Sequence, residues 1–357
     1  MATQSKTAGK IKSQITRFSK RLSCGLNKPR RKFLHQMIYG IQASKDIKLS
    51  NIGRSLGEDI PLKKSENRLS RQINDADLTE FIGRKLTEEA KYWIKDETVL
   101  ALDLSDISKE YSKKQEFLAL VRDGRGKGKI RKGYWTLGIL GADPRGDRVV
   151  PLYGELYSQR ADDFQSENKQ ILAAIDLVRE VIGKKGIWTL DRGADRGIIF
   201  KGLLVRRLRF TIRLRGDRDL ILIDKKGKEG RKGSSLTLAK SCPCRRKVKL
   251  NICKEGEIPK TKDLYLGSRT VKLPFSNTHL TLVVVKGYGK NPLMLLTNVE
   301  MTEKDPLNIL EIYLTRWKCE ESFRFIKQSY NLTGCEGSEL YSLKEHGVFC
   351  DGGILFC

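Results

Sequence analysis

Three acidic residues stand where the pattern of the chain can bring carboxylates together. Asp103 lies near the end of the apolar run VLALDL, and Asp191 ends the apolar run IWTLD. Because the carboxyl ends of neighbouring strands can meet at one edge of a sheet, these two side chains can lie close together. The third, Glu320, lies in a helical pattern over 304–330. Three carboxylates provide the hard oxygen ligands that Mg²⁺ and Mn²⁺ prefer, so they predict a site for divalent metal ions.

The helix that carries Glu320 is predicted to have a polar stripe. At about 100° per residue, its aromatic residues, its carboxylate and its cations fall on one face, whereas core-facing stripes are normally apolar. Such a stripe suits phosphodiester chemistry, because two metal ions can activate an attacking water or hydroxyl and stabilise the leaving oxygen. Cations beside them can hold the adjacent phosphates. The residues of the stripe are Tyr313, Arg316, Trp317, Glu320, Arg324 and Lys327.

The segments around the two aspartates predict an α/β fold. After residue 96, apolar runs of strand length are interspersed with amphipathic helical patterns, and the turn DPRGD is typical of a hairpin. That order predicts a mixed sheet with flanking helices. Strands are expected at 99–104, 133–140, 148–158, 187–191, 210–215 and 293–301, and helices at 162–182, 194–208 and 304–330.

The first 96 residues have a different, all-helical pattern. Helices are expected over 30–43, 50–57, 62–72 and 77–95. The second and third of these are joined by a turn at Gly57–Pro61, which is typical of a helix-turn-helix whose cations contact DNA phosphates or base edges. A simple packing unit of helices is the alternative interpretation. The cations in question are Lys63, Lys64 and Arg68.

The chain divides by composition into several predicted parts. A flexible basic run followed by short β-like pieces predicts a β-rich insertion into the catalytic core. The last residues have no good helical period, and a truncated reading frame is one hypothesis for them. The expected parts are an N-terminal DNA-binding domain at 1–96, the first part of the core at 97–223, the insertion at 224–281, the last strand and Glu-bearing helix at 282–331, and a short tail at 332–357.

The net charge of the chain points to a polyanionic partner. Lys and Arg number 69 against 43 Asp and Glu, which gives a formal net charge of +26. The excess gathers at 1–45, which has no acid, at 122–132 and at 201–249. Three solvated faces are the simpler interpretation, but three separate patches in one chain favour an extended nucleic-acid track. Affinity from such a track is expected to fall steeply with salt.

Several functional classes are excluded by the sequence. No apolar run reaches the roughly 18 residues of a membrane span, and the first residues lack the apolar stretch of a secretory signal. Eight irregularly spaced cysteines favour a reducing cytosol over a disulfide framework. Three histidines exclude most imidazole metal sites. A zinc site at Cys242, Cys244 and Cys253 is a minor alternative, because no fourth ligand lies nearby in the sequence.

The spacing on the last helix resembles a family signature. Tyr313-x2-Arg316-x3-Glu320-x6-Lys327 is similar to the Y-R-E-K signature of bacterial insertion-sequence transposases of the DDE, ribonuclease H-like class. Asp103 resembles the first catalytic aspartate of that family, and Asp191 the second. The resemblance covers about 97–331 and implies a ribonuclease H-like sheet.

The resemblance also implies roles for individual residues. Asp103, Asp191 and Glu320 would hold two divalent ions, Mg²⁺ with Mn²⁺ as a substitute. Family members contact phosphates near the cleaved end through the other signature positions, which here are Tyr313, Arg316 and Lys327. In relatives that form a hairpin intermediate an aromatic residue stacks on a flipped base, and Trp317 is the residue that this would involve.

Three functions are therefore weighed. The first is a metal-dependent DNA transposase of the bacterial cytosol that cleaves transposon ends, joins them to target DNA and works as a homodimer in its synaptic complex. The second is a truncated, inactive DNA-binding remnant or repressor, which would bind DNA but not nick it. The third is a structure-selective nuclease, which would cleave branched or hybrid substrates without preference for element ends. Fold alone does not separate them.

Overall fold

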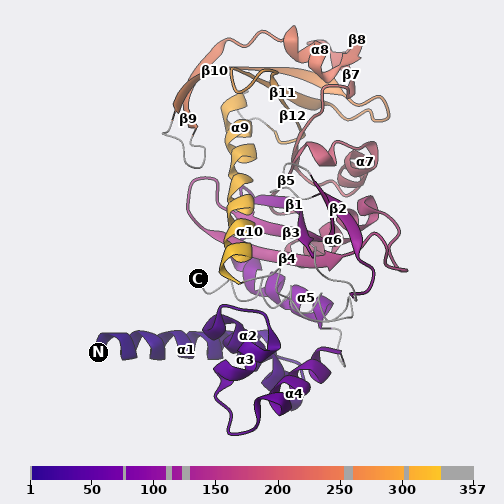
Figure 1. Cartoon of the computed structure of the whole chain (residues 1–357). Coiled ribbons are helices and arrows are strands. Elements are labelled where there is room, and N and C mark those ends of the chain that lie inside the picture. Colours follow the sequence, from indigo (N-terminus) through magenta and orange to yellow (C-terminus); the bar gives the residue numbers. More distant parts are fainter. Residues whose placement is uncertain are drawn as a thin grey trace.

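A long twisted sheet with flanking helices stands above a group of N-terminal helices (Figure 1). The computed structural model describes residues 2–74, 78–109, 115–122, 129–252, 260–300 and 305–330. The predicted tail at 332–357 and most of the basic stretch 122–132 lie outside these residues. None of the described helices is long and apolar enough to cross a membrane.

The elements follow one another in an order close to the predicted one. The helices are α1 (Ala2–Leu22), α2 (Lys28–Ser44), α3 (Leu49–Leu56), α4 (Leu62–Asn74), α5 (Thr79–Ala90), α6 (Glu167–Ile182), α7 (Gly197–Val205), α8 (Ser235–Lys240), α9 (Pro306–Thr315) and α10 (Trp317–Ser329). The strands are β1 (Val99–Ser108), β2 (Ala119–Arg122), β3 (Ile130–Ala142), β4 (Val149–Tyr157), β5 (Ile187–Leu190), β6 (Phe210–Arg213), β7 (Asp219–Ile223), β8 (Glu229–Ser234), β9 (Arg246–Ile252), β10 (Lys260–Lys272), β11 (Leu280–Lys286) and β12 (Leu293–Thr297).

Five strands form the part of the sheet that carries the two aspartates. They lie in the order β4, β3, β1, β5, β6. β3 is antiparallel to both β1 and β4, whereas β1, β5 and β6 are parallel to one another. A mixed sheet of this order, with helical crossovers between its parallel strands, is ribonuclease H-like. The predicted fold class is therefore confirmed.

The core of this region is built by the residues that the helical pattern predicts. The apolar stripe of α6 is buried, and Ser166 caps the helix by accepting a hydrogen bond from the Lys169 backbone N–H at 3.2 Å. Trp188 of β5 is also buried, and Phe200 of α7 meets Phe210 of β6 edge to face at 5.8 Å between ring centroids. These contacts pack β5 and β6 against the helices.

The sheet continues without interruption into the β-rich segment. β12 pairs with β6, and β11, β10, β7 and β8 follow in that order, with β9 paired to β10. The strands of 224–281 thus extend the same sheet, and one short helix, α8, lies among them. Ser234 caps α8 through the Thr237 backbone N–H. The boundaries of the separate domains stay predictions.

The last helix is interrupted, where the sequence predicts one helix over 304–330. α9 ends at Thr315 and α10 begins at Trp317, with Arg316 between them. The Thr315 hydroxyl donates to the Glu311 carbonyl at 2.8 Å, and the Arg316 N–H turns to the Tyr313 carbonyl at 3.2 Å. Such side-chain hydrogen bonds to the preceding turn bend helices, so the prediction of a single continuous helix was wrong at this point.

The N-terminal helices share one hydrophobic cluster. It includes Phe18 of α1, which the sequence does not single out as part of a helix, and Leu34 and Met37 of α2. α2 and α3 approach closely at Gly40, where an added Cβ would lie 2.5 Å from Ile52 Cγ2. Glycine is therefore required at this crossing unless the helices move apart.

Candidate active site

The two aspartates lie side by side at the sheet. β1 and β5 are parallel neighbours in a register that pairs Leu102 with Leu190, and an aspartate follows each of these residues. The Asp191 Oδ1 accepts the Gly193 backbone N–H at 2.7 Å, which holds the carboxylate at the start of a short 3-10 turn. The convergence predicted for Asp103 and Asp191 therefore follows from the strand register.

Glu320 is brought to the same place by the packing of α10 on β1 and β3. Cys319 is buried against Val99, Ala101 and Leu140. On the neighbouring position, the Lys318 ammonium donates to the Asp143 carbonyl at 2.7 Å, in the turn between β3 and β4. These contacts on either side of the helix set the position of the Glu320 carboxylate.

Arg316 lies between two of the predicted metal-binding carboxylates, Asp103 and Glu320. Its Nη1 is 3.4 Å from Asp103 Oδ1, and its Nη2 is 2.6 Å from Glu320 Oε1. The side chain is only 6% exposed, and its guanidinium also lies 5.7 Å from the ring centroid of Tyr313. Among the described residues, no partner accepts a hydrogen bond from its buried Nε. Arg316 thus contacts Asp103, which lies 213 positions before it in the chain, as well as Glu320 on its own helix.

The three carboxylates act on one another electrostatically. Burial raises the pKa of Asp103 to about 7; Arg316 lowers this pKa, while the negative charges of Glu320 and Asp191 raise it further. Burial and like charge both disfavour the ionised form, and one arginine does not offset them. The site is therefore short of positive charge when all three acids are ionised.

The excess negative charge of the three acids raises the question of whether they can bind a divalent ion. The donor set fits by chemistry, since carboxylates are the preferred ligands of hard cations and a cation would relieve the repulsion at Asp103. Within the described residues, however, no three His, Cys, Asp or Glu side chains lie close enough to hold a metal ion as they stand. Arg316 instead bridges Asp103 and Glu320.

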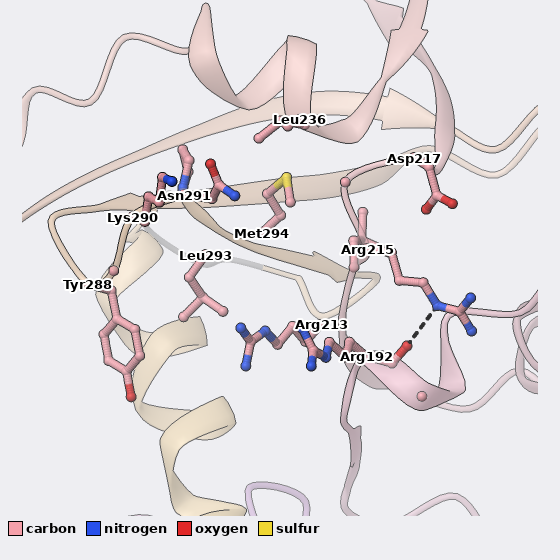
Figure 2. Close-up of a pocket in the computed structure, with 15 residues that line it drawn as sticks. Arg192, Arg213, Arg215, Asp217, Leu236, Tyr288, Lys290, Asn291, Leu293 and Met294 are labelled. Carbon is pink, nitrogen blue, oxygen red and sulfur yellow. Dashed lines mark hydrogen bonds between the residues drawn. The ribbon is translucent and has the colours of Figure 1, made fainter. Parts of the chain in front are cut away.

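A pocket of about 740 Å³ opens beside these residues, between β6 and the segment before β12. Figure 2 shows Arg192, Arg213 and Arg215 on one side of it and Tyr288 and Lys290 on the other. The Arg215 Nε donates to the Arg192 carbonyl at 3.3 Å, the dashed line in the figure. Three arginines and Lys290 line the pocket against one acid, Asp217, and this excess of positive charge suits an anionic ligand.

Tyr288 links this pocket electrostatically to α9 and α10. Burial raises the pKa of the Tyr288 hydroxyl; Tyr313 and Glu320 also raise it, while Arg213 and Arg316 lower it. These groups therefore lie within electrostatic reach of one another. The sequence places Arg213 and Arg215 in the basic stretch 201–249 but gives no signal that Tyr288 and Lys290 meet them.

The predicted DNA-contacting residues of the last helix lie in different environments. Tyr313 is buried under β10, β11 and β12, and Trp317 is 48% exposed beside the site. Arg324 is half-buried. Lys327 belongs to α10, but its side chain lies outside the described residues. Their roles stay predictions.

The predicted cations of the helix-turn-helix lie on α4. Lys64 is exposed, and Lys63 lies 3.3 Å from Glu66 on the same helix. The Arg68 guanidinium pairs with Glu58 at 2.6 Å. Arg68 and hydrogen bonds from Ser65 and Gln36 hold the pKa of the Glu58 carboxyl below its ordinary value, although burial opposes them. This pairing means that Arg68 must exchange Glu58 for a phosphate to contact DNA.

The alternative zinc site gains no support from its described cysteines. Cys242 is buried, and the Cys244 Sγ lies 3.6 Å from the Cys242 carbonyl. Burial raises the pKa of the Cys244 thiol, which disfavours the thiolate that zinc requires. Cys253, the third residue of that alternative, lies outside the described residues.

The sequence and the fold of this chain were each compared with those of known proteins. A family model described as a transposase DDE domain matches residues 150–337, a range that contains Asp191 and Glu320 and begins after Asp103. No curated protein sequence matches the chain. Among solved structures, the chain is similar to piggyBac transposase in a synaptic complex with hairpin DNA, at 10% identity and a TM-score of 0.47, covering 96% of this chain and 70% of that one.

The family match decides the class of protein. It spans more than half of the chain and contains Asp191 and Glu320, two of the three predicted acids, both of which act electrostatically on Asp103. The predicted class of enzyme, a DNA transposase with a DDE domain, is confirmed at this level, and divalent metal ions are general to such enzymes. The chain belongs to the family of transposases that share the DDE domain.

Proposed function

We propose that this chain is a bacterial insertion-sequence transposase that cuts DNA at the ends of its own element. It then joins the freed 3′-hydroxyl to target DNA. The observation that carries this proposal is the shared electrostatic environment of Asp103, Asp191 and Glu320, with Arg316 between two of them. Glu320 and Asp191 both act electrostatically on Asp103, in a protein that otherwise has a strong excess of positive charge.

Asp103, Asp191 and Glu320 are the residues that would hold the divalent ions, with Mg²⁺ as the expected metal and Mn²⁺ as its substitute. When bound, these ions would supply Lewis-acid stabilisation of the attacking and leaving oxygens. The carboxylates need their charges for this role, so Asp103 must give up its proton near neutral pH. The parallel strands beneath Asp103 and Asp191 hold these two side chains in a constant relation.

Arg316 would first bind the two carboxylates and then a DNA phosphate. Without DNA, its guanidinium offsets part of the negative charge of Asp103 and Glu320. Once other cations neutralise those acids, the same guanidinium can donate to a phosphate oxygen near the scissile bond. Its unpartnered Nε, within the described part of the chain, leaves one donor that neither carboxylate satisfies.

The basic pocket would receive the DNA strand next to the reacting phosphate. Arg192 directly follows Asp191, so phosphates bound there would lie beside the catalytic acids. The N-terminal helices, with Lys63, Lys64 and Arg68 on α4, would bind the element end, and Tyr313, Trp317, Arg324 and Lys327 would contact DNA near the cut. Two ends must be held together for transposition, and a homodimer acting on DNA in the bacterial cytosol would do this.

The test of this function is a cleavage assay on the DNA that flanks the gene. The full chain is incubated with that DNA and Mg²⁺ or Mn²⁺, and the products are mapped. We expect nicks that leave a 3′-hydroxyl at inverted repeats, followed by joining to a plasmid target. Binding without nicking in either metal would identify an inactive remnant. Cleavage of branched or hybrid substrates with no preference for the ends would identify a nuclease.

The pocket itself gives a separate prediction. Arg213→Ala is expected to weaken DNA binding and to lower the slope of log Kd against log salt by about one, because one phosphate contact is lost. Fluorescence anisotropy with labelled flanking DNA over a range of salt concentrations measures both. Arg209→Ala is the matched control, since Arg209 precedes the other end of β6 and lies 3.3 Å from Asp96. An equal loss in both variants would contradict the pocket's role.

A further inference from the structure

The C-terminal end of the catalytic helix lies inside the cluster of N-terminal helices. Ile326 and Tyr330 are 4% and 0% exposed and share a hydrophobic cluster with side chains of α1 to α5. In Figure 1, α10 ends beside these helices. Glu320 lies on the same helix, about 15 Å from Tyr330 at the usual rise per residue. The helix α10 thus carries the Glu320 carboxylate near its first turn, and its last turn is surrounded by the hydrophobic cluster of the N-terminal helices.

Tyr330 makes specific contacts there as well as apolar ones. Its hydroxyl donates to Gln42 Oε1 at 3.2 Å. The Lys45 ammonium lies 5.3 Å from the centroid of its ring. Its backbone N–H closes the last turn of α10 by donating to the Ile326 carbonyl at 3.1 Å. Both side-chain partners come from the C-terminal end of α2, so the end of α10 is attached to α2 in particular.

α2 is in turn attached to the predicted helix-turn-helix. Its Gly40 packs directly on Ile52 of α3. Gln36 of α2 donates to Glu58 Oε1 at 3.0 Å, and Glu58 also accepts from Arg68 of α4. A ligand that draws Arg68 away from Glu58 therefore changes the contacts of α2. The same helix holds Tyr330 through Gln42, six residues further along it.

We propose that Tyr330 and Ile326 are positioning residues that transmit DNA binding by the N-terminal helices to α10 and so set the place of the Glu320 carboxylate. This inference rests on the proposed function, because it assumes that α2 to α4 bind DNA. Coupling of this kind needs a continuous set of packed or hydrogen-bonded groups. Arg68, Glu58, Gln36, the body of α2, Gln42 and Tyr330 form such a set.

The test is amide hydrogen exchange of the full chain without metal, with and without duplex DNA from the flanks of the gene. In the wild type, DNA is expected to slow exchange in α10 as well as in α2 to α4. Tyr330→Phe removes the hydroxyl but keeps the ring, and Gln42→Ala removes its acceptor. Each is expected to keep DNA binding and to lose most of the protection that DNA gives to α10.

The double variant Tyr330→Phe with Gln42→Ala is expected to lose no more than either single variant, since both remove one hydrogen bond. Leu86→Ala is the matched control, because Leu86 lies in the same cluster but on α5. This variant is expected to destabilise the fold, but DNA is still expected to slow amide exchange in α10. Equal effects of Leu86→Ala and Tyr330→Phe, or wild-type protection in the double variant, would overturn the proposal.

A second measurement separates this inference from the proposed function. At saturating protein, Tyr330→Ala is expected to slow metal-dependent cleavage by about 100-fold while Kd for DNA changes little, because small misplacements of a catalytic group cost about that much. Unchanged cleavage at saturation overturns the coupling and leaves the function standing. If the proposed function is wrong, the wild-type protein does not cleave the DNA. The hydrogen-exchange experiment still tests the coupling in that case, because it does not depend on cleavage.

Discussion

Glu320→Gln is expected to lower metal-dependent DNA cleavage by at least about a thousandfold while DNA binding stays near the wild-type level. The substitution removes one charge and one ligand oxygen but keeps the shape of the side chain. Its remaining oxygen can still accept from Arg316, which lies 2.6 Å from Glu320 Oε1 in the wild type. Single-turnover cleavage and gel-shift binding on the same DNA measure the two effects separately.

Glu321→Gln is the control for this prediction. Glu321 is the next residue on α10, is exposed, and loses the same charge on substitution. The variant is expected to cleave at nearly the wild-type rate, because the Glu321 side chain is exposed, whereas Glu320 pairs with Arg316. Wild-type cleavage by Glu320→Gln, or equal loss in both variants, would show that Glu320 has no part in the chemistry.

Asp103→Asn is expected to abolish cleavage and yet to stabilise the fold at pH 8. The pKa of Asp103 is about 7 in the folded protein, well above the ordinary aspartate value near 3.9 of an unfolded chain. Between these values the folded state binds more protons than the unfolded state, so stability falls as pH rises through this window. Asparagine removes that loss, which amounts to about 2–4 kcal/mol at pH 8.

Unfolding in urea at about pH 4 and pH 8 measures this effect. The variant is expected to gain stability over the wild type only at the higher pH, and Mg²⁺ is expected to stabilise the wild type more than the variant. Glu97→Gln, at an exposed position just before the same strand, is the control, and this surface substitution is expected to change stability by at most about 0.5 kcal/mol. Destabilisation of Asp103→Asn at pH 8 would contradict the raised pKa.

Local patterns were sufficient for most of the catalytic sheet. Apolar runs predicted β1, β3, β4, β5, β6 and β12, because buried strands carry that signal in their own residues. The short strands β2, β7 and β8 were not predicted. β8 reads EGRKGS and has no apolar alternation, so its strand conformation comes from pairing with β7 rather than from intrinsic preference.

The helical period predicted the last helix less well, because tertiary contacts interrupt its backbone. A constant period of about 100° per residue requires one straight helix from 304 to 330, whereas the turn at Arg316 divides this segment into α9 and α10. The Thr315 hydroxyl bond and the reach of Arg316 to Asp103 both act at that turn. Neither is visible in the pattern of apolar residues.

The sequence by itself predicted three acids as candidates for the chemistry and determined the elements that carry them: Asp103 on one apolar strand, Asp191 directly after another, and Glu320 on a helix. Only the tertiary structure decided that Arg316 lies between Asp103 and Glu320, that Tyr288 faces Arg213 across a pocket, and that Tyr330 ends inside the N-terminal helices. The reason is physical. Periodicity records which face of an element is buried, whereas the partner on that face is set by packing between residues far apart in the chain.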